Sequence, residues 1–365
     1  MCFCDGAAAC RGASAGGMQL LKILLAFTSA TLVSVSAAAG TSSSVLRDED
    51  PLPPYKCDYD NGYYSSIAGY LSIKEPLLKN QKSLKLKIDS FKKKVPVKAV
   101  IQRIPAPLVV VLLGIDGRAE GALGKLWPSW FSEAGYHVLT FDSTFMPGFV
   151  DLSGHGVTGN LWAESERVAE IIAAFLQQSE VKDRVTKIGV VGMSYGGIQS
   201  LVLGQLARDN KLPFKLDAVQ AYSPPIRIHK TGELIDKWYS EDRWQYTLVE
   251  LANKISGHKP VPAGSEIPFS DDMMRAGIAA VFRLNLIDVI VRNENVYELN
   301  VLPKGNNFED EYLKRDFAAV LGYYQFMTDV SYPYWKRKLN LKSISDLVGP
   351  VELSTLMSNQ PAFSE

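Results

Sequence analysis

The sequence predicts an α/β fold whose core is a doubly wound, mostly parallel sheet. Two observations lead to this prediction. Between residues 83 and 225, short apolar runs alternate with stretches of helical periodicity, which is the pattern of parallel strands covered by helices on both faces. After Pro224 and Pro225 this alternation stops, and the sequence favours helix. We therefore expect a helical cap over the carboxyl edge of the sheet.

The elements of the core are expected in a simple order. Residues 83–88 alternate polar and apolar side chains, and together with residues 95–104 they predict an antiparallel hairpin at a sheet edge. Residues 107–114 form a continuous apolar run, as a strand does when both of its faces are buried. The remaining expected elements are strands at 137–142, 187–192 and 216–222, and helices at 120–134, 161–178 and 197–207.

The cap is expected to be helical throughout and to carry several aromatic side chains, Trp238 and Trp244 among them. Most of these rings are expected to form the core of the cap, while a few line a substrate pocket. The cap helices are predicted at 232–255, 271–293, 309–330 and 332–347.

The amino terminus has the pattern of a secretory signal. Lys22 precedes an apolar stretch at 23–35, and Ala37 to Ala39 offer small residues for cleavage. The apolar stretch is shorter than the roughly 20 residues that a spanning helix needs. We expect Met18 to be the true start, cleavage to occur near Ala39, and the product to be secreted or periplasmic, with no membrane span after cleavage.

These patterns divide the chain into five expected parts. They are a leader and signal peptide at 1–39, a linker and N-terminal extension at 40–82, the α/β core at 83–225, the helical cap at 226–350, and a C-terminal core segment that begins at 351–365.

Composition excludes some classes of partner and site. Lys and Arg together number 39, as do Asp and Glu, so the zero net charge argues against nucleic acid as a partner. Cys2, Cys4 and Cys10 precede Met18, which leaves Cys57 alone in the expected mature chain. We therefore expect no intrachain disulfide and no cysteine-rich metal site. The oligomeric state is left open.

The segment 192–196, Gly-Met-Ser-Tyr-Gly, matches the pattern G-x-S-x-G, with an expected strand before it and an expected helix after it. This is the context of a nucleophile elbow, in which a serine occupies a sharp, strained turn. Gly192 and Gly196 lack a Cβ, so the strand and the helix can approach closely. We expect the Ser194 hydroxyl to project at the carboxyl edge of the sheet.

This order of elements, with the elbow at its centre, resembles the α/β-hydrolase fold over residues 83–225. In that family, the loop after the third strand supplies an oxyanion-hole amide and often begins His-Gly. Here Leu113 stands where histidine is common, but Gly114 and Gly117 are present. The resemblance implies that the backbone N–H groups of Ile115 and Tyr195 form the oxyanion hole.

The resemblance also implies an acid and then a histidine after Ser194 in the chain. Beyond Ser194 the histidines are His229 and His258, and neither follows an expected late strand. His229 is a candidate base, as is His155 in a Gly-His-Gly loop; His258 is a weaker one. Because the last residues are polar where a seventh strand is expected, we expect the sequence to be incomplete after Glu365, with the acid and histidine beyond it.

The sequence thus predicts a secreted serine hydrolase that acts on an ester or on an amide or peptide bond through an acyl-enzyme at Ser194. The expected substrate is a small molecule or a peptide, and no organic cofactor or metal is indicated. The alternative is a non-catalytic binding protein on the same fold, since no complete triad is recognisable.

Overall fold

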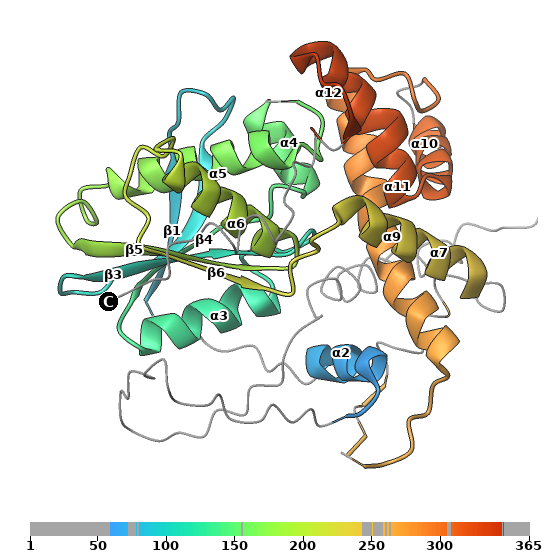
Figure 1. The fold of residues 1–365 in the computed structure, drawn as a ribbon, viewed down its shortest axis with the longest axis horizontal. Coiled ribbons are helices and arrows are strands. Elements are labelled where there is room, and N and C mark those ends of the chain that lie inside the picture. The colour runs from blue at the N-terminus through green and yellow to red at the C-terminus, as the bar shows by residue number, and fades with distance from the viewer. Residues whose placement is uncertain are drawn as a thin grey trace, which may run out of the picture.

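In the described part of the chain, six strands form the central sheet, in the order β1-β2-β4-β3-β5-β6 (Figure 1). Their bounds are β1 (Gln81–Leu86), β2 (Val95–Val100), β3 (Ala106–Leu112), β4 (His137–Thr140), β5 (Val185–Met193) and β6 (Ala218–Tyr222). The computed structural model describes residues 59–71, 78, 80–154, 156–242, 250, 258–259, 261–262, 264–304, 308–344 and 346.

The strands run mostly parallel. β2 pairs antiparallel with both β1 and β4, while β4, β3, β5 and β6 pair parallel to one another in that spatial order. The predicted doubly wound, mostly parallel sheet is therefore confirmed, including the hairpin at one edge. In the described part of the chain, β6 forms the other edge.

Helices cover both faces of the sheet, as Figure 1 shows. Successive residues of a strand point to opposite faces, so the apolar run of β3 contributes to both sides. Val109 packs in one cluster with Trp127, and Val110 packs in the other with Phe175. The covering helices are α3 (Ala122–Glu133) on the first face, and α5 (Leu161–Leu176) and α6 (Tyr195–Arg208) on the second.

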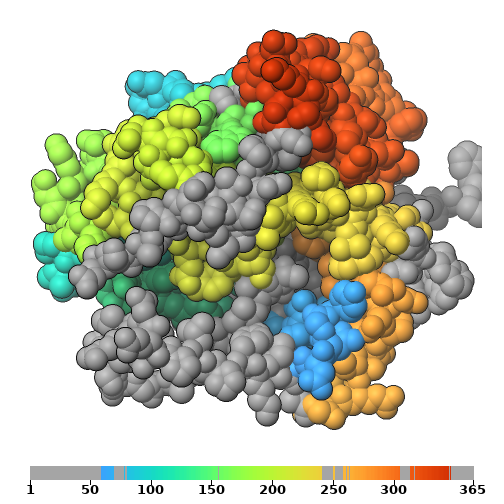
Figure 2. All heavy atoms as spheres, in the orientation of Figure 1, coloured from blue at the N-terminus to red at the C-terminus, as the bar shows by residue number. Residues whose placement is uncertain are grey.

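The cap follows the sheet in the chain and gathers on one side of the molecule, as the yellow, orange and red atoms in Figure 2 show. The predicted helix at 309–330 is interrupted before Gly322, where the carboxylate of Asp236 accepts the amides of Tyr323 and Tyr324 at 2.9 Å each. A Cβ at Gly322 would lie 2.1 Å from Asp236 Oδ2, so a side chain there would displace the Asp236 carboxylate from these amides. The cap elements are α7 (Ile228–Asp242), α9 (Asp271–Tyr297), α10 (Phe308–Val320), α11 (Tyr323–Gln325), the π-helix η2 (Phe326–Ser331) and α12 (Tyr332–Leu339).

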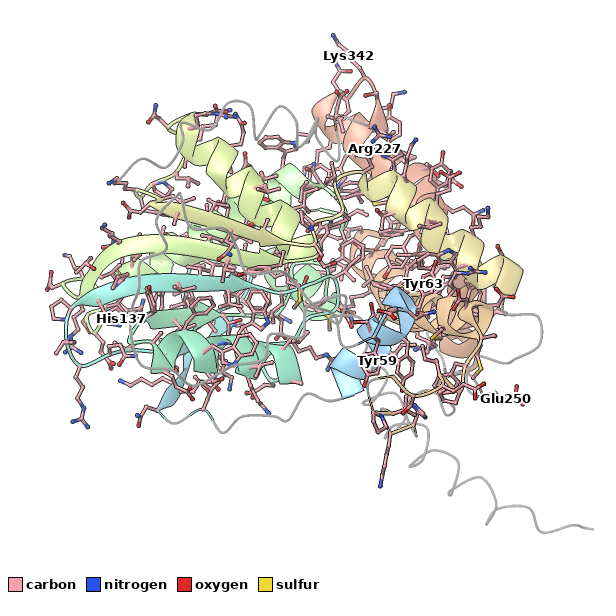
Figure 3. The ribbon with its side chains drawn as sticks, turned by 60° about the horizontal axis from the view of Figure 1, so that its bottom comes forward. Tyr59, Tyr63, His137, Arg227, Glu250 and Lys342 are labelled. Carbon is pink, nitrogen blue, oxygen red and sulfur yellow. The ribbon has the colours of Figure 1, made fainter. Side chains whose placement is uncertain are left out.

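Two helices lie where none is expected. α4 (Pro147–Ser153) begins at a proline in the loop after β4. α2 (Gly62–Leu71) lies within residues 40–82 and buries Tyr64 and Ile67 against Met274 of α9. Figure 3 shows Tyr63 on the cap side of the molecule, and its ring meets that of Trp238 edge-on at 5.5 Å. Helix α2 therefore packs as part of the cap.

The expected signal peptide at 1–39, the amino-terminal part of the linker and the segment 351–365 lie outside the described residues. Among the helices that are described, none combines the length and the apolar character that crossing a membrane requires.

Candidate active site

Ser194 lies at the junction of β5 and α6, after the last residue of the strand and before the first residue of the helix. Its backbone has φ 52° and ψ −118°, a conformation that side-chain-bearing residues rarely adopt. The Ser194 amide donates to the Tyr222 carbonyl of β6 at 2.9 Å, so the strained residue is held by the neighbouring strand. This is the elbow geometry that the sequence predicts.

The glycines around Ser194 are required by close backbone contacts. A Cβ at Gly192 would lie 2.0 Å from the Gly196 carbonyl oxygen, and a Cβ at Gly196 would lie 2.3 Å from the Leu112 carbonyl oxygen. Real Cβ atoms do not approach backbone atoms this closely. The two glycines therefore allow strand β5, helix α6 and the end of β3 to meet at one point.

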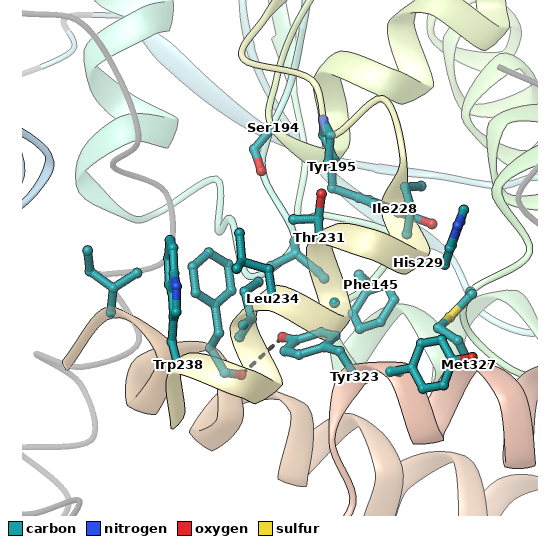
Figure 4. Close-up of a pocket in the computed structure, with 18 of the residues that line it drawn as sticks. Phe145, Ser194, Tyr195, Ile228, His229, Thr231, Leu234, Trp238, Tyr323 and Met327 are labelled. Carbon is teal, nitrogen blue, oxygen red and sulfur yellow. Dashed lines mark hydrogen bonds between the residues drawn. The ribbon is translucent and has the colours of Figure 1, made fainter. Parts of the chain in front are cut away.

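Ser194 lines a cavity of about 350 Å³ between the sheet and the cap. Most of its described lining is apolar, with Phe145 from the core and Ile235, Phe282 and Met327 from the cap. Figure 4 shows the Ser194 hydroxyl at one wall of this cavity, opposite the cap helices. Its polar lining includes Ser223, His229, Thr231 and Tyr323.

One of these polar groups is already bonded within the cap. The Tyr323 hydroxyl donates to the Phe282 carbonyl at 3.0 Å, the dashed line in Figure 4. Burial raises the pKa of the Tyr323 phenol well above its usual value, and the nearby Asp116 and Asp236 carboxylates raise it further. Tyr323 is therefore a neutral wall of the cavity.

The loop after β3 lies directly beside the serine. A Cβ at Gly114 would be 3.5 Å from the Ser194 Cβ, and the Ile115 side chain lines the same cavity. Gly117 donates to the Gly114 carbonyl at 2.9 Å, which closes a tight turn over residues 114–117. The carbonyl of Gly117 in turn accepts the Ser143 amide at 2.8 Å.

Tyr195 begins α6, so its amide has no carbonyl partner within the helix. The Ile115 amide is likewise outside the hydrogen bond that closes its turn. Both residues that the sequence assigns to the oxyanion hole thus lie beside Ser194 and line its cavity. Their role in catalysis stays a prediction.

A buried carboxylate lies beneath the elbow. Glu164 Oε2 accepts hydrogen bonds from the Thr144 hydroxyl at 2.6 Å and the Tyr195 phenol at 2.7 Å, and Oε1 accepts the Gly159 amide at 2.7 Å. Burial raises the pKa of Glu164, and these three hydrogen bonds oppose that rise. The Tyr195 pKa is raised as well, by burial and by the Glu164 carboxylate.

Among the described residues, no histidine is hydrogen-bonded to the Ser194 hydroxyl. His229 lines the cavity, but in Figure 4 Thr231 and Ile228 lie between its ring and Ser194. His258 instead shares a 2.9 Å hydrogen bond with the Tyr64 hydroxyl of α2. The other candidate base, His155, lies outside the described residues.

His137 serves the fold at the far end of the sheet, remote from the cap (Figure 3). Its Nδ1 accepts the Gln102 amide at 3.0 Å, so the ring is neutral and Nε2 donates to the Arg184 carbonyl at 3.1 Å. Burial, the largest cause, lowers the pKa of this imidazole. His137 is therefore structural.

Three polar residues near the site were not predicted from the sequence: Glu164, Asp116 and Asn285. Asp116 follows Ile115, is 1% exposed, and accepts a hydrogen bond from Asn285 of α9 at 3.1 Å. No local sequence signal marks this pair, because its members are 169 residues apart. The described residues contain no group of three or more His, Cys, Asp or Glu side chains that could hold a metal ion.

The sheet, the elbow at Ser194 and the helical cap form a fold of the α/β-hydrolase type, in agreement with the resemblance of the motif. No protein-family model and no curated protein matches the chain. Several solved structures match part of it. Est1E from Butyrivibrio proteoclasticus is 19% identical over 42% of this chain and 56% of its own, with a TM-score of 0.32.

Two further solved structures match to a similar degree. A dienelactone hydrolase from Anabaena variabilis is 15% identical over 37% of this chain and 61% of its own, with a TM-score of 0.30. The esterase Pf2001 from Pyrococcus furiosus is 17% identical over 47% of this chain and 57% of its own, with a TM-score of 0.31. The chain spans less than two thirds of each of these structures, and similarity at this level assigns it no activity, substrate or residue role.

Proposed function

We propose that this protein is a serine hydrolase that cleaves a carboxylic ester or an amide bond through an acyl-enzyme on Ser194. The observation that carries the proposal is the strained backbone of Ser194, φ 52°, at a strand–helix junction that opens into a cavity. Strain of this kind persists only where the surrounding structure holds it, and it is concentrated at functional sites.

In the proposed reaction, the Ser194 oxygen attacks the substrate carbonyl as its proton passes to a base. The negative charge that develops on the carbonyl oxygen is stabilised by the amides of Ile115 and Tyr195, each of which supplies about 3 kcal/mol. The tetrahedral intermediate expels the alcohol or amine, and water then hydrolyses the acyl-enzyme. His229 is the candidate base among the described residues, because it shares the cavity with Ser194.

The proposed substrate carries an uncharged, apolar acyl or aryl group. The described lining is mostly apolar and includes Phe145, Phe282 and Met327. Tyr323, a buried phenol in the same lining, is held neutral. Such a lining favours apolar surface and disfavours a charged group, which would lose its hydration on entry.

The alternative is a binding protein that uses the same cavity without catalysis. It is favoured by one observation: the described residues place no histidine in hydrogen-bond contact with the Ser194 hydroxyl. A serine without a base is a weak nucleophile at neutral pH.

Labelling with a fluorophosphonate separates the two functions. For a hydrolase, we expect the reagent to label the peptide that contains Ser194, and a Ser194→Ala variant to remain unlabelled. Peptide mapping distinguishes Ser194 from Ser223, a second serine that lines the cavity. If the folded protein is not labelled and does not hydrolyse p-nitrophenyl butyrate, the hydrolase function is contradicted and the binding function is favoured.

We also propose that the protein is exported, on the signal-like pattern of residues 18–39. Amino-terminal sequencing of the product from expressing cells tests this directly. Export predicts a new terminus near Gly40, whereas an intact segment after Met18 in a cytoplasmic product would contradict it.

A further inference from the structure

We propose that Asn285 of the cap and Asp116 of the loop after β3 are positioning residues, which hold the Ile115 amide in place for the oxyanion. This inference rests on the proposed hydrolase function. It assigns the cap a part in the reaction beyond that of covering the substrate.

The first observation is the position of Asp116 in the turn. The hydrogen bond between the Gly117 amide and the Gly114 carbonyl, at 2.9 Å, makes Ile115 and Asp116 the two central residues of the turn. Because the Ile115 amide is not used in that bond, its direction depends on how the turn is held. The Asp116 side chain is the immediate neighbour that can hold it.

The second observation is the partner of Asp116. The Asn285 side-chain nitrogen donates to Asp116 Oδ2 at 3.1 Å and to the Val281 carbonyl, one turn earlier in α9, at 3.3 Å. Asp116 is 1% exposed and Asn285 is 6% exposed, so water does not compete freely for the bond. The amide nitrogen is thus oriented by its own helix and presented to the loop.

The core holds the same loop on its other side. Ser143 donates to the Gly117 carbonyl at 2.8 Å, and the Ala119 amide donates to Asp142 Oδ1 at 2.8 Å. These bonds hold Gly117, the last residue of the turn, and the chain after it, whereas the bond from Asn285 reaches Asp116, a central residue of the turn. Loss of the cap contact would leave the end of the turn fixed but its central residues freer to rotate.

A donor to an oxyanion is effective only when its direction is set before the reaction. Loosening the turn should therefore slow the chemical step and change substrate binding little. A purely structural role would instead lower stability and leave kcat of the folded protein unchanged. The two roles differ in a measurable way.

The test exchanges the partners. Asn285→Asp places two carboxylates against each other, and adding Asp116→Asn restores a donor and an acceptor in reversed order. Asn285→Ala removes the donor without adding charge, in case Asn285→Asp does not fold. The matched control is Asn293→Asp, the same substitution on α9, where the buried Asn293 donates to the Val289 carbonyl at 2.8 Å and accepts the Thr158 amide at 3.0 Å.

We expect Asn285→Asp to lower kcat on p-nitrophenyl butyrate, and the rate of fluorophosphonate labelling, by about tenfold or more, with KM within about twofold of wild type. The reversed pair should recover most of that loss. Asn285→Ala should change the rates in the same direction, and Asn293→Asp should leave kcat within about twofold. Hydrogen exchange of residues 113–119 should be faster in Asn285→Asp and should return toward wild type in the reversed pair.

Unchanged kcat and unchanged exchange in a folded Asn285→Asp or Asn285→Ala variant would overturn the proposal. So would an equal loss of kcat in Asn293→Asp, which would indicate a general effect of disturbing α9. If the wild-type protein is neither labelled nor active, the proposed function fails. The exchange measurement then decides by itself whether Asn285 holds the turn.

Discussion

The Tyr195 phenol donates a 2.7 Å hydrogen bond to Glu164, so the residue that follows the strained serine is tied to a buried carboxylate in α5. The same carboxylate accepts the amide of Gly159, which lines the cavity. One carboxylate thus joins the start of α6 to the cavity wall, and Tyr195 cannot shift without disturbing both.

Replacement of Tyr195 by Phe tests that connection. We expect the free energy of unfolding to fall by about 1 to 3 kcal/mol, because a buried hydrogen bond to a carboxylate is lost. Urea denaturation measures the change. Tyr136→Phe is the control: the Tyr136 hydroxyl makes no hydrogen bond among the described residues, and its loss should change stability by less than about 0.5 kcal/mol. Equal effects would mean that the bond to Glu164 contributes nothing.

Gly196→Ala tests the close approach at the elbow. The added methyl group would lie 2.3 Å from the Leu112 carbonyl oxygen, and backbone on both sides cannot yield easily. We expect a loss of at least about 3 kcal/mol in unfolding free energy, together with loss of Ser194 labelling. Gly148→Ala in α4 is the control, since a Cβ there meets nothing within 4 Å. A stable, fully labelled Gly196→Ala protein would contradict the elbow geometry.

His137 predicts a pH dependence of stability. Its pKa is lowered in the folded protein, mainly by burial, so below pH 6.5 the unfolded chain binds a proton that the native ring does not. Stability should therefore fall as the pH decreases below 6.5, by at most about 1.4 kcal/mol per pH unit from this group.

The unfolding free energies of the wild-type protein and of the His137→Gln variant must be compared at each pH. Glu164, whose pKa is raised, acts with the opposite sign, because the native protein holds a proton there above pH 4.5 that the unfolded chain has lost. Its contribution cancels between wild type and variant. We expect the stability advantage of the wild-type protein over His137→Gln to become smaller as the pH is lowered from 7.5 to 5.5. A constant difference would refute the lowered pKa of His137.

His229→Gln tests the base. If His229 accepts the serine proton, its replacement should slow Ser194 labelling by about 10² to 10⁴-fold with no comparable loss of stability. His258→Gln is the control, since His258 is bonded to Tyr64 of α2. His155→Gln is measured beside them. A labelling rate that survives in His229→Gln and falls in His155→Gln would transfer the role to His155.

The core could be predicted from sequence because its signals are local. Each strand from β1 to β6 and each of the helices α3, α5 and α6 has its own periodicity, whereas the short α4 does not, and the five residues 192–196 mark the elbow by themselves. Helix α2 could not be predicted in the same way. Its sequence contains Gly62 and Gly69, two weak helix formers, and the helix is stabilised by packing against α9 rather than by propensity.

The other residues of the site are likewise not marked by local sequence signals. Asp116 and Asn285 are brought together only by the packing of α9 on the loop after β3, and nothing in the glycine pattern of that loop indicates Asn285 as a partner. The same is true of Tyr323, whose place at the cavity depends on the break before Gly322 and on its bond to Asp236. Sequence periodicity places such residues on helices but does not say which loop they meet.

The order of the elements along the chain determines the order in which the walls of the cavity are synthesised. The six strands of the described sheet lie between residues 81 and 222, so this sheet and the strained serine can form on the ribosome before the cap has emerged. Until Phe282 and Met327 have been synthesised, the Ser194 side of the sheet faces water. Helix α2 is made first of all, yet its partner α9 comes some 200 residues later, a separation that makes this contact slow to find. The apolar segment of α2 therefore has no partner until α9 has been synthesised, and a chaperone that binds this segment would delay the closing of the cavity without touching the serine.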